Sequence, residues 1–270
     1  MTFRNFKKTI KLYKTLRTSE IDSIQLFLFL LQDVSTKELN VRKKHRLVNH
    51  LTFFVMQKLL FLHYLHPINK YSLNILYIRN SSNGLYNPYG IALHPTLNAL
   101  YIADALNHRI MSYTLGNNSG TLLFGFNGAG NNNTQLNWPV GLYFDILTNS
   151  LVVANTAANN IVRYVLGSSF WTLIAGDISG AAGTTPARLY RPTAATFDPM
   201  GNLYVADMNN HRIQFFYAGQ LNASTIAGIT RVNGTNATTL AAPWSLRLDS
   251  QLNLYVADTY NHRIQKFLRY

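Results

Sequence analysis

The stretch Asn202-Leu-Tyr-Val-Ala-Asp-Met-Asn-Asn-His-Arg-Ile213 joins a short strand, a polar turn and the start of a second strand. Successive side chains of a strand point to opposite sides, so Val205 faces one side and Ala206 the other. Both sides of this strand are largely apolar, as in a sheet that is packed between two other sheets. The stretch therefore predicts a strand that is buried on both faces and leads into a tight turn.

The same pattern recurs four times along the chain. The strand is found at Ala99–Asp104, Ser150–Asn155, Asn202–Asp207 and Asn253–Asp258, and its last residues are 51, 52 and 51 positions apart. Each copy also has a proline fifteen or sixteen residues upstream of its last residue, namely Pro88, Pro139, Pro192 and Pro243. Self-similarity with a fixed period is the signature of a repeat architecture.

Each repeat has room for four short strands and for no crossover helix. A strand such as Gly90–Leu93 follows each proline, a turn such as Asp198–Asn202 leads into the second strand, and a third strand follows, as at His211–Phe216. Fourth strands are expected at Thr121–Phe124, Trp171–Ala175 and Ser224–Ala227. Four-stranded units in series predict an all-β propeller with four blades.

We divide the chain into a basic, mostly helical segment at residues 1–68 and the repeat region at residues 69–270. The last repeat ends at Tyr270 just after its third strand, and the segment 74–79 is our candidate for its missing outer strand, which would close the ring. A six-bladed propeller truncated to four blades and an open arc or solenoid stay open as alternatives.

The turn between the second and third strands reads Asp-x-x-Asn-His-Arg-Ile at 104–110, 207–213 and 258–264. With the preceding strand and the upstream proline, this pattern resembles the NHL repeat family, over roughly residues 71–270. The resemblance implies a propeller, most often with six blades in that family.

The recurring Asp and Arg lie five residues apart across a tight turn, close enough for a charge-assisted hydrogen bond. Because these residues recur in three repeats, we interpret them as a structural motif: Asp104, Asn107, His108, Arg109, Asp207, Asn210, His211, Arg212, Asp258, Asn261, His262 and Arg263. The second repeat departs from the motif, with Asn155 for Asp and Asn159 and Asn160 for His and Arg. Its turn must be held by neutral hydrogen bonds.

The sequence contains no catalytic motif. Cysteine is absent, and there is no phosphate-binding glycine loop, nucleophile elbow or zinc-protease helix, so we predict a non-enzymatic protein without a cofactor. His108, His211 and His262 could in principle bind zinc, and a resemblance to peptide-amidating lyases keeps a metal-dependent lyase as the second alternative. Zinc ligands must converge to about 2.1 Å from the metal, whereas repeat-equivalent positions spread around a propeller, so we predict no metal site.

Binding is the function that the loops favour. The loops between blades are long and rich in Gly and Asn, and loops on a rigid scaffold commonly carry recognition. Arginines beside aromatic residues suit a protein hot spot or stacked RNA bases; the candidates are Trp138, Arg188, Tyr190, Arg191, Arg231 and Trp244. A protein or peptide ligand is our first prediction, RNA is the alternative, and no DNA contact is expected. Packing between blades is the structural alternative for the two tryptophans.

The N-terminal region carries most of the basic charge. Residues 1–70 have thirteen Lys or Arg against four Asp or Glu, whereas the remaining residues have eleven against seven. Four lysines at 7, 8, 11 and 14 fit either a basic amphipathic helix on a membrane or a solvated helix face. The stretch Leu47–Ile68 has the order of a signal anchor, but Lys58 and several polar residues interrupt it.

The compartment stays open at this level. Sequons for N-glycans occur at Asn80, Asn117, Asn132, Asn222, Asn233 and Asn236, which slightly favours a secreted or cell-surface protein over a cytosolic adaptor.

Overall fold

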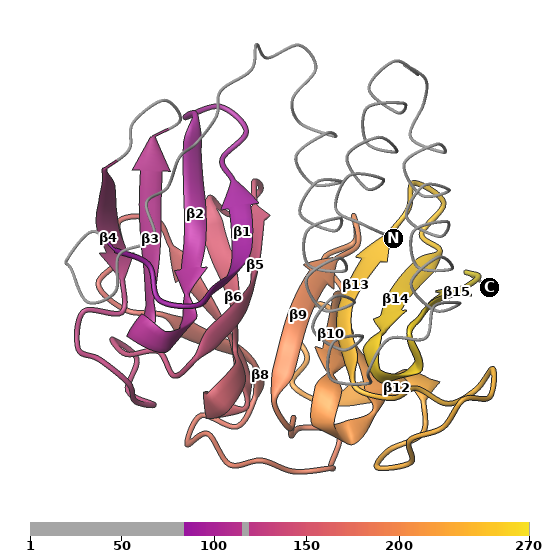
Figure 1. Cartoon of the computed structure of the whole chain (residues 1–270). Helices are drawn as coiled ribbons and strands as arrows, with labels where there is room; N and C mark the ends of the chain where they lie inside the picture. The colour runs from indigo at the N-terminus through magenta and orange to yellow at the C-terminus, as the bar shows by residue number, and fades with distance from the viewer. Residues whose placement is uncertain (1–83, 115–118, 270) are drawn as a thin grey trace, which may run out of the picture. The chain divides into compact units, whose positions relative to one another are not determined.

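The structure, a computed structural model, describes residues 84–114 and 119–269 (Figure 1). These residues form four antiparallel sheets that follow one another along the chain. The predicted helical segment, the signal-anchor stretch and the closing strand at 74–79 lie outside the described residues. Within the described ranges, no helix has the length and apolar character needed to cross a membrane.

The first blade consists of β1 (Pro88–Leu93), β2 (Ala99–Asp104), β3 (Arg109–Thr114) and β4 (Gly120–Phe124). The second consists of β5 (Pro139–Asp145), β6 (Ser150–Asn155), β7 (Asn160–Val165) and β8 (Thr172–Gly176). The third consists of β9 (Pro192–Phe197), β10 (Leu203–Asp207), β11 (Arg212–Phe216) and β12 (Ala223–Gly228). The fourth consists of β13 (Pro243–Leu248), β14 (Leu254–Asp258) and β15 (Arg263–Phe267).

This architecture confirms the predicted all-β propeller with four blades. Each proline opens an innermost strand, and the fourth strands begin within one residue of their expected positions. The sheet of the last blade has three strands in the described part of the chain.

Strand β10 shows why both sides of the second strand are apolar. Leu203 and Val205 pack with Val152 of the second blade, whereas Ala206 packs with Leu254 of the fourth blade. Alternate side chains of one strand therefore contribute to two different cores. Burying each large aliphatic side chain contributes about 1.5–3 kcal/mol, so the blades are stabilised by stacking on their neighbours.

The innermost strands lie next to one another in chain order: β1 beside β5, β5 beside β9 and β9 beside β13. Between the first three blades the approach is backbone to backbone. A Cβ atom at Gly90 would lie 2.3 Å from the carbonyl oxygen of Val140, and one at Gly141 would lie 2.4 Å from that of Thr193. Any larger residue at these two glycines would push the blades apart.

A short 3-10 turn joins the second and third strands of every blade: η1 (Ala105–Asn107), η2 (Thr156–Ala158), η3 (Met208–Asn210) and η4 (Thr259–Asn261). The residue after each turn is left-handed, with φ between 53° and 57° at His108, Asn159, His211 and His262. The loops that link consecutive blades reach their prolines at the same end of the sheets, because Pro192 pairs with Asp207 and Asp207 with Arg212. We call this end of the blades the loop face.

Candidate functional site

The loop face is organised by a buried carboxylate. Asp207 has no exposed surface, and its Oδ1 accepts a hydrogen bond from the backbone N–H of Tyr190 at 2.7 Å. Its Oδ2 accepts from Nδ2 of Asn210 and from Nε of Arg212, both at 2.8 Å. Arg212 in turn donates through Nη2 to the carbonyl of Arg188 at 3.0 Å. The carboxylate thus joins a strand end, a turn, the next strand and the incoming loop, and we call this set of contacts the clasp.

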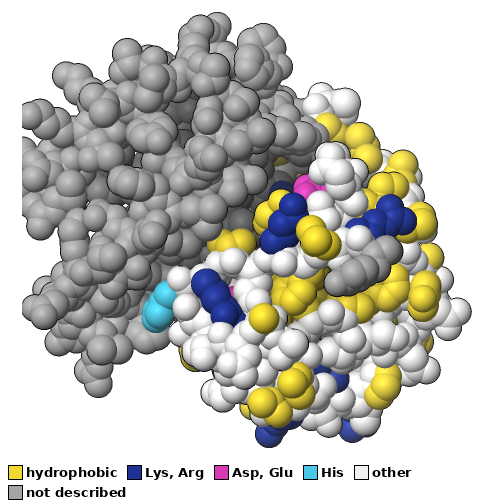
Figure 2. Space-filling view, turned by 90° about the vertical axis from the view of Figure 1, so that its right-hand side faces the viewer, with side chains coloured by type: hydrophobic (Ala, Val, Ile, Leu, Met, Phe, Trp, Pro, Cys, Tyr) yellow, Lys and Arg dark blue, Asp and Glu magenta, His cyan; other side chains and the backbone are white. Residues whose placement is uncertain are grey.

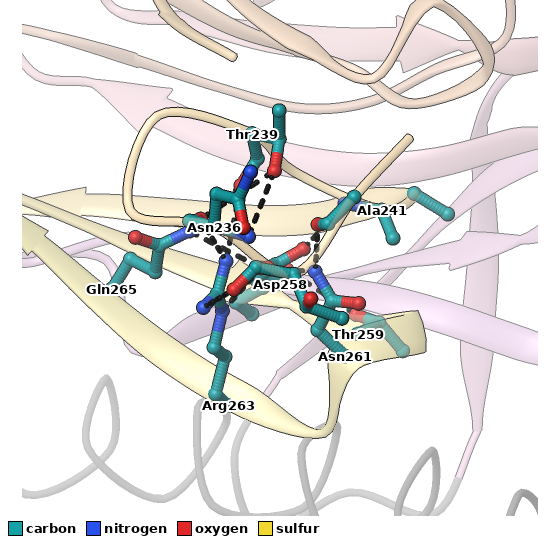
Figure 3. Close-up of polar contacts among 12 residues, drawn as sticks. Asn236, Thr239, Ala241, Asp258, Thr259, Asn261, Arg263 and Gln265 are labelled. Atoms are coloured by element: carbon teal, nitrogen blue, oxygen red, sulfur yellow. Dashed lines mark hydrogen bonds and ion pairs between the residues drawn. The ribbon is translucent and has the colours of Figure 1, made fainter. Parts of the chain in front are cut away.

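The clasp is repeated in the first and fourth blades. Asp104 and Asp258 accept hydrogen bonds through Oδ2 from Nε of Arg109 and of Arg263, respectively, both at 2.7 Å. Each also accepts one from Nδ2 of the asparagine in its turn at 2.8 Å. Figure 3 shows the fourth-blade clasp, in which Arg263 also reaches the carbonyls of the loop that carries Asn236 and Thr239. These contacts are internal to the protein, and we infer that the motif residues hold the fold rather than a ligand.

The second blade replaces the ion pair with neutral groups. Oδ1 of Asn155 accepts a hydrogen bond from the backbone N–H of Asn137 at 2.6 Å. The hydrogen bond to the incoming loop, which Asp207 makes in the third blade, is therefore retained without a charge. Asn160 is too short to reach the loop carbonyls that arginine reaches elsewhere. Instead, the buried indole of Trp171 donates to the carbonyl of Gln135 at 2.7 Å, at the position that corresponds to the Arg188 carbonyl in the third blade. Sequence reasoning did not identify this substitute.

A second set of hydrogen bonds ties the turn of each of the first three blades to the next blade. Nδ1 of His108 accepts the backbone N–H of Trp138 at 3.0 Å, and Nδ1 of His211 accepts that of Ala242 at 3.1 Å. Asn159 does the same for Arg191 through its Oδ1 at 2.9 Å. Burial lowers the pKa of both histidines, and at His211 the Arg231 guanidinium adds to the effect. The neutral imidazole is the form whose Nδ1 can accept a hydrogen bond.

Four of the predicted binding residues form a connected surface on the loop face. The guanidinium carbon of Arg191 lies 4.7 Å from the ring centroid of Trp138, and that of Arg231 lies 5.7 Å from the ring of Tyr190. Tyr190 and Arg191 are neighbours in the chain, so the two pairs are continuous. We call Trp138, Arg191, Tyr190 and Arg231 the stacked-arginine site.

Three residues of this site have an unfavourable backbone conformation. The φ angles are 52° at Trp138, 51° at Arg191 and 64° at Arg231, in the left-handed region that costs about 1–2 kcal/mol for a residue with a Cβ. Asn87 and Ala242 have the same conformation at the position equivalent to Trp138, so the backbone belongs to the repeat. Arg191 occupies this same position in the third blade, so the strain at Trp138 and Arg191 comes from the repeat and is not by itself a sign of function.

The remaining candidates lie in different surroundings. Trp244 packs 5.8 Å from the ring of Tyr89, which also packs edge-on against Trp138 at 6.1 Å. Arg188 is exposed and pairs with Asp177 at 3.3 Å. Tyr89 was missed by the sequence reasoning, although it follows Pro88 as Trp244 follows Pro243 and the repeat register alone could have indicated it.

A pocket of 280 Å³ lies at the opposite end of the blades, and none of the predicted binding residues lines it. Its walls include Phe197, Tyr217 and Leu221, and Arg163 stacks over Phe197 at 5.2 Å. Burial opposes the ionisation of Asp145, but hydrogen bonds from Arg163 and Thr148 outweigh it and lower the pKa of Asp145. Arg163 is therefore committed to an internal ion pair of 2.6 Å.

A metal centre has no geometric support in the described ranges, where no three His, Asp or Glu side chains gather closely enough to hold an ion. His108 and His211 already use Nδ1 as an acceptor for the backbone.

Comparison with known proteins agrees with the repeat and the fold. The NHL repeat profile matches residues 189–216 and 240–267. NHL repeat-containing protein 2 of Homo sapiens is 35% identical over 97 residues, and that of Bos taurus is 39% identical over 98. Each alignment covers 33% of this chain and only 13% of the relative.

Solved structures resemble the chain in fold. An auxiliary nutrient binding protein from Bacteroides thetaiotaomicron aligns with a TM-score of 0.53 and 19% identity, over 66% of this chain and 46% of the other. A catalytically inactive virginiamycin B lyase from Staphylococcus aureus, with quinupristin, aligns with a TM-score of 0.50 and 18% identity, over 72% and 55%. The two neighbours differ in function, and at these identities the likeness extends to the fold alone.

The fold and the clasp define a β-propeller protein built from sequence repeats. Two of its four repeats match the NHL repeat profile, and over about a third of its length the chain is similar to NHL repeat-containing protein 2.

Removing the clasp carboxylate should destabilise the fold strongly. In Asp207→Ala, Arg212 would stay buried without its partner, and breaking a buried ion pair in this way costs about 3–5 kcal/mol. Urea unfolding of the full chain should show the loss. The control is Asp177→Asn, which removes an exposed pair and should leave the unfolding midpoint unchanged. Equal midpoints for the two variants would contradict the role assigned to the clasp.

His108 and His211, which accept hydrogen bonds from the next blade, should make stability depend on pH. Their folded-state pKa lies below the ordinary value of 6.5, so the unfolded chain binds more protons. Their stabilising contribution is therefore complete above about pH 6.5 and is lost as the pH falls through the lower folded-state pKa.

The double variant His108→Asn/His211→Asn adopts the residue that the second blade already uses. It should keep the hydrogen bonds and lose less stability than the wild type when urea unfolding is compared at about pH 7.5 and 5.5. An identical drop in both proteins would show that these histidines do not titrate with folding.

Proposed function

We propose that the chain is a non-enzymatic recognition module that binds a protein or peptide ligand on its loop face, through the stacked-arginine site. The observation that carries this proposal is the pairing of Arg191 with Trp138 and of Arg231 with Tyr190. Arginine with tryptophan or tyrosine is the combination that dominates hot spots of protein interfaces. Stacking also restricts the guanidinium before a ligand arrives, which reduces the entropy lost on binding.

The surroundings of the site support the same proposal. Tyr190, Arg191 and Trp138 are half-buried and Arg231 is exposed, so the site is accessible but anchored. The Nε1 of Trp138 is buried and has no hydrogen-bond partner among the described residues. Buried donors without a partner are uncommon in proteins, and an acceptor of a ligand would reach this one only if a neighbouring side chain moved on binding.

The experiment is a selection of linear peptides from a random display library on the full-length wild-type chain. Selected peptides should bind the double variant Arg191→Asn/Arg231→Asn about tenfold or more weakly, because each charged hydrogen bond contributes at least ~1.5 kcal/mol. Asparagine tolerates a left-handed backbone better than arginine, so this variant should be at least as stable as the wild type.

The matched control is Lys266→Asn/Arg269→Asn. It removes the same charge at exposed positions toward the other end of the fourth blade and should bind like the wild type. Selected peptides that bind the double variant as well as the wild type would place the interaction elsewhere, and a selection without binders would argue against a peptide-recognition function.

A further inference from the structure

Two arginines on the loop face, Arg191 and Arg231, have no acidic side chain paired with them in the described part of the chain. Neither Arg191 nor Arg231 makes a side-chain hydrogen bond or an ion pair within residues 84–114 and 119–269. Each is held only by the face of an aromatic ring. A cation–π contact does not use the N–H groups of the guanidinium as hydrogen-bond donors, so its five donors stay available to an acceptor.

No carboxylate remains in the described ranges that could neutralise them. These ranges contain seven Asp and no Glu. Three of the seven form clasps, Asp145 pairs with Arg163, and Asp177 pairs with Arg188. Asp198 and Asp249 cap their own turns, where each accepts hydrogen bonds from an asparagine four residues later. Any anionic partner of Arg191 and Arg231 would therefore come from outside this part of the chain.

We propose that the ligand of the stacked-arginine site is an acidic peptide segment that places one carboxylate on Arg191 and a second on Arg231. The inference rests on the proposed function and adds the chemistry of the ligand. A carboxylate matches the planar fork of a guanidinium and can accept two parallel N–H bonds. The aromatic rings of Trp138 and Tyr190 lie beneath these arginines and offer apolar contact to the rest of the segment.

The small number of basic side chains that are not paired with aspartate favours a short peptide over RNA. A nucleic-acid interface neutralises on the order of 6–10 phosphates. The described residues carry ten Lys or Arg, but five of them are already paired with aspartate. On the face that Figure 2 shows, the basic side chains form separate groups with uncharged surface between them. Two stacked arginines fit two carboxylates better than a continuous phosphate backbone.

The test uses three labelled probes on the full-length chain, measured by fluorescence polarisation. The first is a decapeptide of alternating glutamate and glycine, the second is its glutamine counterpart, and the third is a single-stranded RNA of ten uridines. We expect the glutamate peptide to bind, the glutamine peptide to bind at least about tenfold more weakly, and the RNA to bind more weakly than the glutamate peptide.

The variants Arg191→Asn and Arg231→Asn should each weaken the glutamate peptide about tenfold, whereas Lys266→Asn/Arg269→Asn should not. Equal affinity for the glutamate and glutamine peptides, or tighter binding of RNA, would overturn the inference. The peptide selection separates this failure from a failure of the proposed function. Selected binders that lack acidic residues but still require Arg191 and Arg231 would remove the acidic ligand and keep the recognition role.

Discussion

A buried aspartate at the end of the second strand is the constraint on which the rest of the structure depends. Asp207 accepts from the incoming loop, from the turn and from the next strand, and it is fully excluded from solvent. A buried carboxylate is tolerated only when it is paired and fully hydrogen-bonded, so it requires both Asn210 and Arg212. In the first, third and fourth blades the incoming loop is thereby attached to the blade that follows it, and Asn155 makes the corresponding contact in the second blade.

The loop face uses arginine in two different ways. The clasp arginines, such as Arg212, are neutralised by aspartate and donate to loop carbonyls, so they are part of the fold. The stacked arginines, Arg191 and Arg231, lie on aromatic rings and have no carboxylate partner in the described ranges. Net charge counts both classes of arginine alike, whereas only the stacked arginines lack a carboxylate partner in the described ranges.

The second blade shows that the geometry of the clasp matters more than its charge. Asn155 keeps the hydrogen bond to the incoming loop, and Trp171 supplies the donor that arginine supplies elsewhere. The left-handed residue after the turn shows the same interchange, since Asn159 replaces histidine as the acceptor for the next blade. A repeat can therefore lose its signature residues and still hold its place between two neighbours.

The sequence by itself determined the repeat, the four blades, the order of their strands and the partnership of Asp and Arg, because these depend on residues that are close in the chain. Val205 and Ala206 alternate within one strand, and Asp207 and Arg212 lie across one turn, so period and spacing are sufficient. The tertiary structure decided which binding candidates meet. Trp138 and Arg191 are more than fifty residues apart, and their contact depends on the rotation of one blade against the next, which no local pattern encodes. It also decided that Arg188 is paired, that Tyr89 joins the aromatic residues and that Trp171 replaces an arginine, since each of these contacts crosses between segments that only packing brings together.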